Sequence, residues 1–333
     1  MRIAILAGAL AALACTIGIA PRAVLTPGAS PPGRPNASPI ALPPLHTPTP
    51  STTPTPGHSP TPTALGGGGS EMLYHSGPPG EEEIVRLGMA GGTPIDLTNS
   101  RGADITPRFS PDGQQIAFAS DRDGDLDIYV MNADGSGLVK LTQNDSLDDA
   151  PSWSPDGEFL AFSTDRDGNR EIYRMRADGA GLLRLTAHLA FDITPAYSPD
   201  GATIAFASNR EGGDMELYLM SSDGGDVRRL TDAPGRDEYP AWSPDGSALA
   251  FASNRTGDFE IFELVLASGF IRNLTDHPAQ DGSPAYSPDG KLLAFSSNRL
   301  GSYEIFVLDL ASQEATRLTR NSTFDGDPGW APG

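Results

Sequence analysis

The sequence predicts an all-β protein whose main part is a six-bladed β-propeller of four-stranded antiparallel blades. Three observations lead to this prediction. An aromatic residue recurs at intervals of 44 or 45 residues. Each interval contains short apolar segments separated by turn sequences. The first and last repeats are each incomplete, and what one lacks the other supplies.

The repeat is marked by an aromatic residue just before a turn. The spacings are 44, 44, 45, 44 and 44, and the residues are Phe109, Trp153, Tyr197, Trp242, Tyr286 and Trp330. One full repeat, residues 148–186, reads DDAPSWSPDGEFLAFSTDRDGNREIYRMRADGAGLLRLT. Its SPDG is typical of a β-turn. The stretches FLAFST, EIYRM and LLRLT, with the stretch before the turn, predict four short strands that bury both faces only by stacking around an axis.

The first repeat lacks its inner strand. Tyr74, Ile84 and Thr98 each lie 44 positions before a residue that has the same place in the second repeat, but no strand pattern precedes them. The C-terminal DPGWAPG, residues 327–333, resembles the start of a repeat. We therefore expect the C-terminal strand to pair with the N-terminal blade, which closes the ring and removes exposed strand edges.

Residues 1–20 combine an early arginine, an apolar run and small residues, which is typical of an export signal or a membrane anchor. Three outcomes stay open: cleavage with secretion, retention as an uncleaved anchor, or lipidation of Cys15, because LAALAC resembles a bacterial lipobox. Each of them places the rest of the chain outside the cytoplasm, at the cell surface or in the periplasm.

Residues 21–70 are rich in proline, threonine and glycine, which predicts a disordered stalk, a candidate for glycosylation, rather than a packed domain. Residues 71–333 form the predicted propeller. This part has 20 basic and 43 acidic residues, a net charge of −23, which argues against binding to nucleic acid or to anionic lipid. Contact with a membrane is therefore expected only through the N-terminal segment or a lipid on Cys15.

The recurring SPDG, AFASNR, EIY and RLT elements resemble the propeller repeats of the TolB family, over nearly all of residues 71–333. This resemblance implies a six-bladed propeller outside the cytoplasm that serves as a protein-docking platform; TolB itself binds the peptidoglycan-associated lipoprotein. The proline-rich stalk replaces the α/β domain that precedes the propeller in TolB.

Each repeat has an aspartate five residues before the aromatic residue, on the face that also carries an arginine loop. The aspartates are Asp104, Asp148, Asp192, Asp237, Asp281 and Asp325; the arginines are Arg122, Arg166, Arg210, Arg255 and Arg299, with Pro78 in the sixth place. In one interpretation each aspartate pairs with loop amides or an arginine and fixes the chain there. In the other, the six carboxylates ring the channel mouth and bind Ca²⁺. The loop DRDGDLD, residues 121–127, lacks the EF-hand spacing and is interpreted as an acidic hairpin loop.

The sequence gives little support for catalysis, since it contains no G-x-S-x-G motif and no His, Asp and Ser set at useful positions. We therefore expect a non-catalytic, monomeric propeller without a cofactor that binds an envelope protein or a cell-wall polymer through the aspartate and arginine face. The alternatives are a sensor or carbohydrate-binding propeller that depends on a divalent cation and, third, a hydrolase or lyase.

Overall fold

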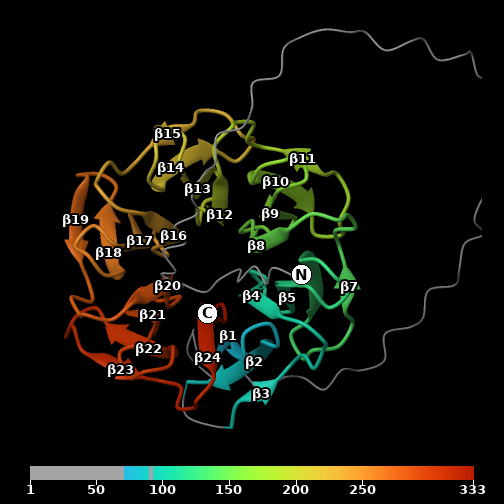
Figure 1. The fold of residues 1–333 in the computed structure, drawn as a ribbon, viewed down its shortest axis with the longest axis horizontal. Helices are drawn as coiled ribbons and strands as arrows, with labels where there is room; N and C mark the ends of the chain where they lie inside the picture. The colour runs from blue at the N-terminus through green and yellow to red at the C-terminus, as the bar shows by residue number, and fades with distance from the viewer. Residues whose placement is uncertain (1–70, 90–92) are drawn as a thin grey trace, which may run out of the picture. The chain divides into compact units, whose positions relative to one another are not determined.

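The computed structural model describes residues 71–89 and 93–333. Within these ranges the chain forms six four-stranded antiparallel sheets, which lie as blades around a central axis (Figure 1). The predicted six-bladed propeller is thus confirmed. No helix in this described part is long and apolar enough to cross a membrane. The predictions for the export signal, Cys15 and the stalk concern residues outside it.

The blades are numbered in chain order, and their strands run from the axis outward. Blade 1 contains β24 (Phe324–Trp330), β1 (Glu71–Gly77), β2 (Glu83–Gly88) and β3 (Ile95–Asp96). Blade 2 contains β4 (Asp104–Phe109), β5 (Gln115–Ser120), β6 (Asp127–Asn132) and β7 (Val139–Lys140). Blade 3 contains β8 (Asp148–Trp153), β9 (Phe159–Thr164), β10 (Glu171–Arg176) and β11 (Leu183–Arg184).

The other three blades follow the same plan. Blade 4 contains β12 (Asp192–Tyr197), β13 (Thr203–Ser208), β14 (Glu216–Ser221) and β15 (Arg228–Arg229). Blade 5 contains β16 (Asp237–Trp242), β17 (Ala248–Ser253), β18 (Glu260–Val265) and β19 (Phe270–Asn273). Blade 6 contains β20 (Asp281–Tyr286), β21 (Leu292–Ser297), β22 (Glu304–Asp309) and β23 (Ala315–Arg317).

The hydrophobic core lies between neighbouring blades and is centred on the second strand of each. Both faces of this strand are buried, so it reads as a continuous apolar run such as QIAFAS. In blades 2 to 6 its phenylalanine is fully buried and lies against an aromatic ring of the third strand, with centroids 5.8–6.3 Å apart. This stacking of apolar sheets stabilises the ring without any disulfide bond.

Blade 1 is assembled from both ends of the propeller, as predicted. Met72 pairs with Trp330 and Leu73 pairs with Gly329 in an antiparallel ladder. Figure 1 shows this join, where the red strand β24 lies beside the blue strand β1. The β24–β1 ladder closes the ring.

Each inner strand contains a β-bulge that the sequence did not lead us to expect. In β4, Ile105 pairs with Ala119 and Arg108 with Ala117, so one extra residue is accommodated between them. One bulge residue per inner strand has a positive φ of 49–56°, and each precedes a proline: Thr106, Ala150, Thr194, Tyr239, Ser283 and Asp327. Non-glycine residues seldom adopt this conformation. The bulges bring these six side chains to the central channel.

The inner strands run from one face of the propeller to the other. We call the face that carries the SPDG turns, residues 110–113, 154–157, 198–201, 243–246 and 287–290, the turn face. The opposite face carries Arg122, Arg166, Arg210, Arg255 and Arg299, and we call it the arginine face.

Candidate functional site

The six predicted aspartates lie near the start of the inner strands and are at most 1% exposed. Five of them pair with the arginine that follows the second strand of the same blade, at N–O distances of 2.7–3.0 Å: Asp104–Arg122, Asp148–Arg166, Asp192–Arg210, Asp237–Arg255 and Asp281–Arg299. These contacts are of the kind that the first interpretation of the aspartates expects.

Each of these arginines also packs against aromatic rings of its own blade. The guanidinium carbon lies 4.7–5.5 Å from the centroids of the two stacked aromatic rings of its blade. Its Nε donates to the hydroxyl that ends the second strand, as Arg210 does to Ser208 at 3.1 Å. Only 13–19% of each arginine side chain is exposed. The pairs therefore join the loop, the inner strand and the core of one blade.

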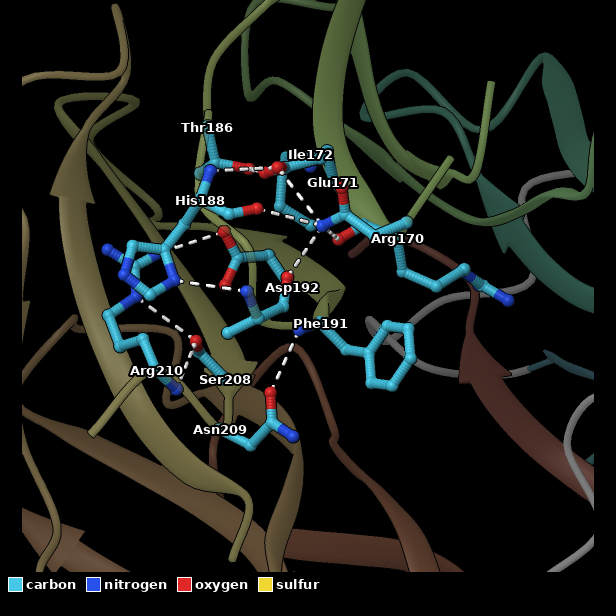
Figure 2. Close-up of polar contacts among 12 residues, drawn as sticks. Arg170, Glu171, Ile172, Thr186, His188, Phe191, Asp192, Ser208, Asn209 and Arg210 are labelled. Atoms are coloured by element: carbon cyan, nitrogen blue, oxygen red, sulfur yellow. Dashed lines mark hydrogen bonds and ion pairs between the residues drawn. The ribbon is translucent and has the colours of Figure 1, made fainter. Parts of the chain in front are cut away.

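Figure 2 shows the arrangement around Asp192. Arg210 Nη2 donates to Asp192 Oδ2 at 2.7 Å, and the preceding Phe191 N–H donates to Asn209 Oδ1 at 2.8 Å. Asp192 N–H donates to the carbonyl of Arg170, so the crossover from blade 3 to blade 4 is fixed at three points. Burial raises the pKa of Asp192, although Ser208 and Arg210 favour the ionised form.

A second set of acidic residues, at the start of each third strand, was missed by the sequence reasoning; Glu83 is half-buried and the other five are buried. Its members are Glu83, Asp127, Glu171, Glu216, Glu260 and Glu304. In blade 3, Thr186 Oγ1 donates to Glu171 Oε2 at 2.6 Å and accepts the N–H of Ile172 at 2.9 Å (Figure 2). The signal was visible in the recurrence of EIY and RLT, since a threonine follows each acid after 15 residues.

Blade 1 departs from the pattern because Pro78 stands where the other blades have arginine. Asp325 instead accepts hydrogen bonds from Asn321 Nδ2 at 3.0 and 2.9 Å. Burial raises the pKa of Asp325, and the nearby Glu304 adds to this effect. Among the residues that the structure describes, Asp325 therefore has no cationic partner.

The predicted aspartates lie in six separate blades, each with its own partner. Among residues 71–89 and 93–333, no three His, Cys, Asp or Glu side chains lie close enough together to hold a metal ion. In the loop 121–127, Asp121 accepts the N–H of Ala103 at 2.6 Å and Asp123 accepts a hydrogen bond from Lys140 Nζ at 2.6 Å. These carboxylates thus have partners within the protein.

A cavity of about 290 Å³ lies in the central channel on the side of the turn face, and we call it the cup. Its lining includes the six bulge residues, five prolines that follow them (Pro151, Pro195, Pro240, Pro284 and Pro328), and four aromatic residues (Phe109, Trp242, Tyr286 and Trp330). The cup is therefore walled by rigid proline and aromatic groups with polar side chains among them, which is typical of a ligand site.

Two polar residues of the cup lining, Ser283 and Asp327, are hydrogen-bonded to each other, and the buried His75 lies beside Asp327. Ser283 Oγ donates to Asp327 Oδ1 at 2.6 Å, and Asp327 Oδ2 lies 3.4 Å from His75 Nδ1. Burial lowers the pKa of His75, so the imidazole is neutral at pH 7. Gly326 makes room for this ring, because a Cβ there would lie 2.6 Å from His75 Nε2.

Arg108 is the cationic residue of the cup lining. It occupies the second position after the bulge, where the other blades have the small residues Ser152, Ala196, Ala241, Ala285 and Gly329. Its Nη1 donates to the carbonyls of Pro107 at 2.8 Å and Asp327 at 3.3 Å. The sequence reasoning missed this residue, although comparison of the repeats would have shown it as the exception.

The family model described as the TolB beta propeller domain matches residues 55–191 and 189–279. The chain belongs to the TolB β-propeller family. None of the curated proteins compared with it matches significantly. The resemblance to TolB expected from the SPDG, AFASNR, EIY and RLT elements is thereby confirmed.

Solved structures agree with the TolB assignment at the level of the fold. TolB from Acinetobacter baumannii has a TM-score of 0.72 and 24% identity, over 79% of this chain and 67% of that one. A putative TolB from Agrobacterium tumefaciens has a TM-score of 0.64 and 22% identity, over 77% and 90%. Oligogalacturonate lyase from Vibrio parahaemolyticus has a TM-score of 0.54 and 18% identity, over 76% and 75%. Propellers of this shape therefore occur in both TolB proteins and a lyase.

Proposed function

We propose that this TolB-family propeller is an exported, non-catalytic binding module that receives a segment of an envelope protein or cell-wall polymer in the cup. The observation that carries this proposal is the cup itself, with its proline and aromatic walls around a few polar groups. Its volume of about 290 Å³ suits a side chain or a chain end rather than a folded element.

The aspartate and arginine pairs have a supporting role in this proposal. They fix the crossover into the inner strands of blades 2 to 6 and thereby hold the walls of the channel in one geometry. Preorganised walls reduce the conformational entropy lost when a ligand binds. The surplus of acidic residues in the propeller, 43 against 20 basic, favours a partner with basic or neutral groups.

Capture of partners from an envelope extract tests the site. The full chain is compared with Ala241→Phe, which fills the cup from its wall, and with Leu189→Ser, which changes a side chain that is 98% exposed in the crossover after blade 3. We expect Ala241→Phe to lose the captured partner and Leu189→Ser to keep it. If Leu189→Ser loses the partner and Ala241→Phe keeps it, the partner binds outside the channel.

Two further measurements address export and catalysis. Metabolic labelling with a fatty acid, with Cys15→Ser as the control, distinguishes lipidation from cleavage or an uncleaved anchor. Incubation with oligogalacturonate tests the lyase alternative, and the assay is run with and without manganese because an oligogalacturonate lyase of similar fold was solved in complex with that metal. Product release in that assay would contradict a non-catalytic role.

A further inference from the structure

Arg108 has donors left over after its contacts within the protein. A guanidinium has five N–H groups, whereas among residues 71–89 and 93–333 Arg108 donates to two carbonyl oxygens alone, those of Pro107 and Asp327, both through Nη1. In the part of the chain that the structure describes, no carboxylate oxygen lies within 4 Å of it, in contrast to the five arginines of the arginine face.

Arg108 borders two hollows. Arg108 lines the cup and also a second hollow of about 250 Å³ on the turn face, which Ser110, Trp153 and Pro332 border as well. Small residues surround it in the wall, including Ser152 and Gly329. A ligand that enters from the turn face can therefore reach the side chain without displacing protein groups.

The surroundings of Arg108 favour an anionic partner. Burial lowers the pKa of Arg108, and the Asp327 carboxylate opposes this only in part. Asp327 is turned toward other groups, since Oδ1 accepts from Ser283, Oδ2 faces His75, and only 1% of the residue is exposed. A carboxylate from a ligand matches the forked geometry of a guanidinium better than a neutral acceptor does.

The charges on the turn face limit which kind of ligand can bring a carboxylate to Arg108. Five exposed aspartates stand in the SPDG turns: Asp112, Asp156, Asp200, Asp245 and Asp289. Hydrogen bonds from the turn serines lower the pKa of each of them, so they are ionised at pH 7. Within the described residues, Asp289 is the one member of the five that has an ion pair, to Lys291. A purely anionic ligand is repelled by these aspartates, whereas a chain with basic groups before an anionic end fits them.

We propose that the cup binds the C-terminal carboxylate of a partner peptide on Arg108, with basic residues of that peptide facing the aspartates of the turn face. This inference rests on the proposed function and adds the chemical class of the ligand. A free carboxylic acid presents the same group without the basic residues, so the two sources can be separated.

Fluorescence anisotropy on the full chain tests the proposal with a labelled lysine-containing tetrapeptide that ends in a free carboxylate. The matched probe is the same peptide with an amidated C-terminus. We expect the free acid to bind about tenfold or more tightly than the amide. Arg108→Gln should abolish this difference, whereas Arg320→Gln, at an exposed arginine outside the cup, should preserve it.

Each outcome bears on one claim. Equal affinity of the two peptides for the unmodified protein overturns the carboxylate site, whether or not Arg108→Gln folds. If acetate displaces the labelled peptide at concentrations near the peptide's dissociation constant, a simple carboxylic acid binds as well as the peptide does. That result would overturn the claim that the bound carboxylate belongs to a peptide. If Ala241→Phe still abolishes capture of an envelope partner while the two peptides bind equally, the proposed function stands and only this inference fails.

Discussion

Asp281 and Arg299 are ion-paired at 2.8 Å, and this contact ties the start of β20 to the loop after β21. The carboxylate is fully buried, while the arginine side chain is 13% exposed. Removal of one partner from such a pair leaves the other as an uncompensated charge. The same relationship recurs in four other blades, so its loss in one blade can be compared directly with the blade that lacks it.

Asp281→Asn should lower the free energy of unfolding by about 3 kcal/mol, because Arg299 is left without its anion. At the same pH, Asp325→Asn should lower the free energy of unfolding by less, because Asp325 has Asn321 rather than an arginine as its partner. Urea denaturation followed by tryptophan fluorescence measures both. Equal losses would mean that the arginine is not what makes the aspartate important.

The pH dependence of stability should differ between buried and turn aspartates. Burial raises the pKa of Asp325 above 3.8, so its ionisation disfavours the folded state as the pH rises through the folded pKa. Hydrogen bonds from Ser243 and Ser247 lower the pKa of Asp245 to about 2, so its contribution is present above the unfolded pKa and is lost as the pH falls.

Over the range from about pH 2 to about pH 7, the stability difference from the unmodified protein should therefore change in opposite directions in the two variants. Asp245→Asn should lose stability relative to the unmodified protein as the pH rises from about 2 to about 4, whereas Asp325→Asn should recover relative stability as the pH rises above about 4. Melting temperatures across this range measure the two slopes. Slopes of the same sign for both variants would contradict the assignment of opposite pKa shifts.

The hydroxyl of Thr186 should contribute more to the free energy of unfolding than the hydroxyl of Thr106. Thr186 Oγ1 joins Glu171 and the N–H of Ile172, so Thr186→Val leaves two buried groups unpaired and should cost about 2 kcal/mol. Thr106 Oγ1 is buried and has no hydrogen-bond partner within the described part of the chain, so Thr106→Val should be neutral or stabilising. Chemical denaturation of the pair decides this. A costly Thr106→Val would indicate that its hydroxyl has a partner in solution.

The closing strand should be essential to the fold. Trp330 is half-buried, and its Nε1 donates to the carbonyl of Ala285 in blade 6 at 3.0 Å, so Trp330→Ala should cost about 3 kcal/mol. Deletion of residues 322–333 removes β24 and exposes the edge of β1, which should cause aggregation. A chain that begins at Glu71 is the control and should melt like the full chain. The reverse pattern would contradict closure through blade 1.

Millimolar calcium should leave the melting temperature unchanged, because each of the six aspartates already has a hydrogen-bonding or ionic partner in its own blade. A binding site would raise the temperature through linkage. A shift that the double substitution Asp192→Asn and Asp281→Asn abolishes would favour the calcium ring instead.

The blade count and the closure could be predicted because both depend on the repeat, and a regular spacing identifies equivalent residues without any coordinates. The bulges could not be predicted in this way. A stretch such as DITPRF reads as an ordinary strand, and its proline is tolerated because the inner strand is an edge strand of its blade. Only the backbone at Thr106 shows that this stretch has an extra residue and a left-handed conformation.

The contacts of the candidate site could not be predicted from the sequence either, because they involve residues that depart from the repeat. His75 has the position that Ala119 has in the next blade. The space for its larger side chain is provided by Gly326, which lies near the other end of the chain. Arg108 differs from small residues in five blades, but a single sequence does not tell whether such a difference faces solvent or a cavity. Side-chain direction near the axis is set by the bulges, which the repeat pattern conceals.

The β24–β1 ladder has a consequence for the order in which the blades fold. It joins segments from the two ends of the propeller, as does the hydrogen bond between the hydroxyl groups of Ser76 and Thr323, which lie 247 positions apart. A chain made or exported from its N-terminus presents β1 early and β24 last, so blades 2 to 6 can fold while blade 1 still lacks its inner strand. Bringing the two ends together carries a loop-closure cost that the other blades do not bear. The final step of folding is therefore expected at blade 1, and the unpaired edge of β1 is the place where a chaperone would be needed until β24 arrives.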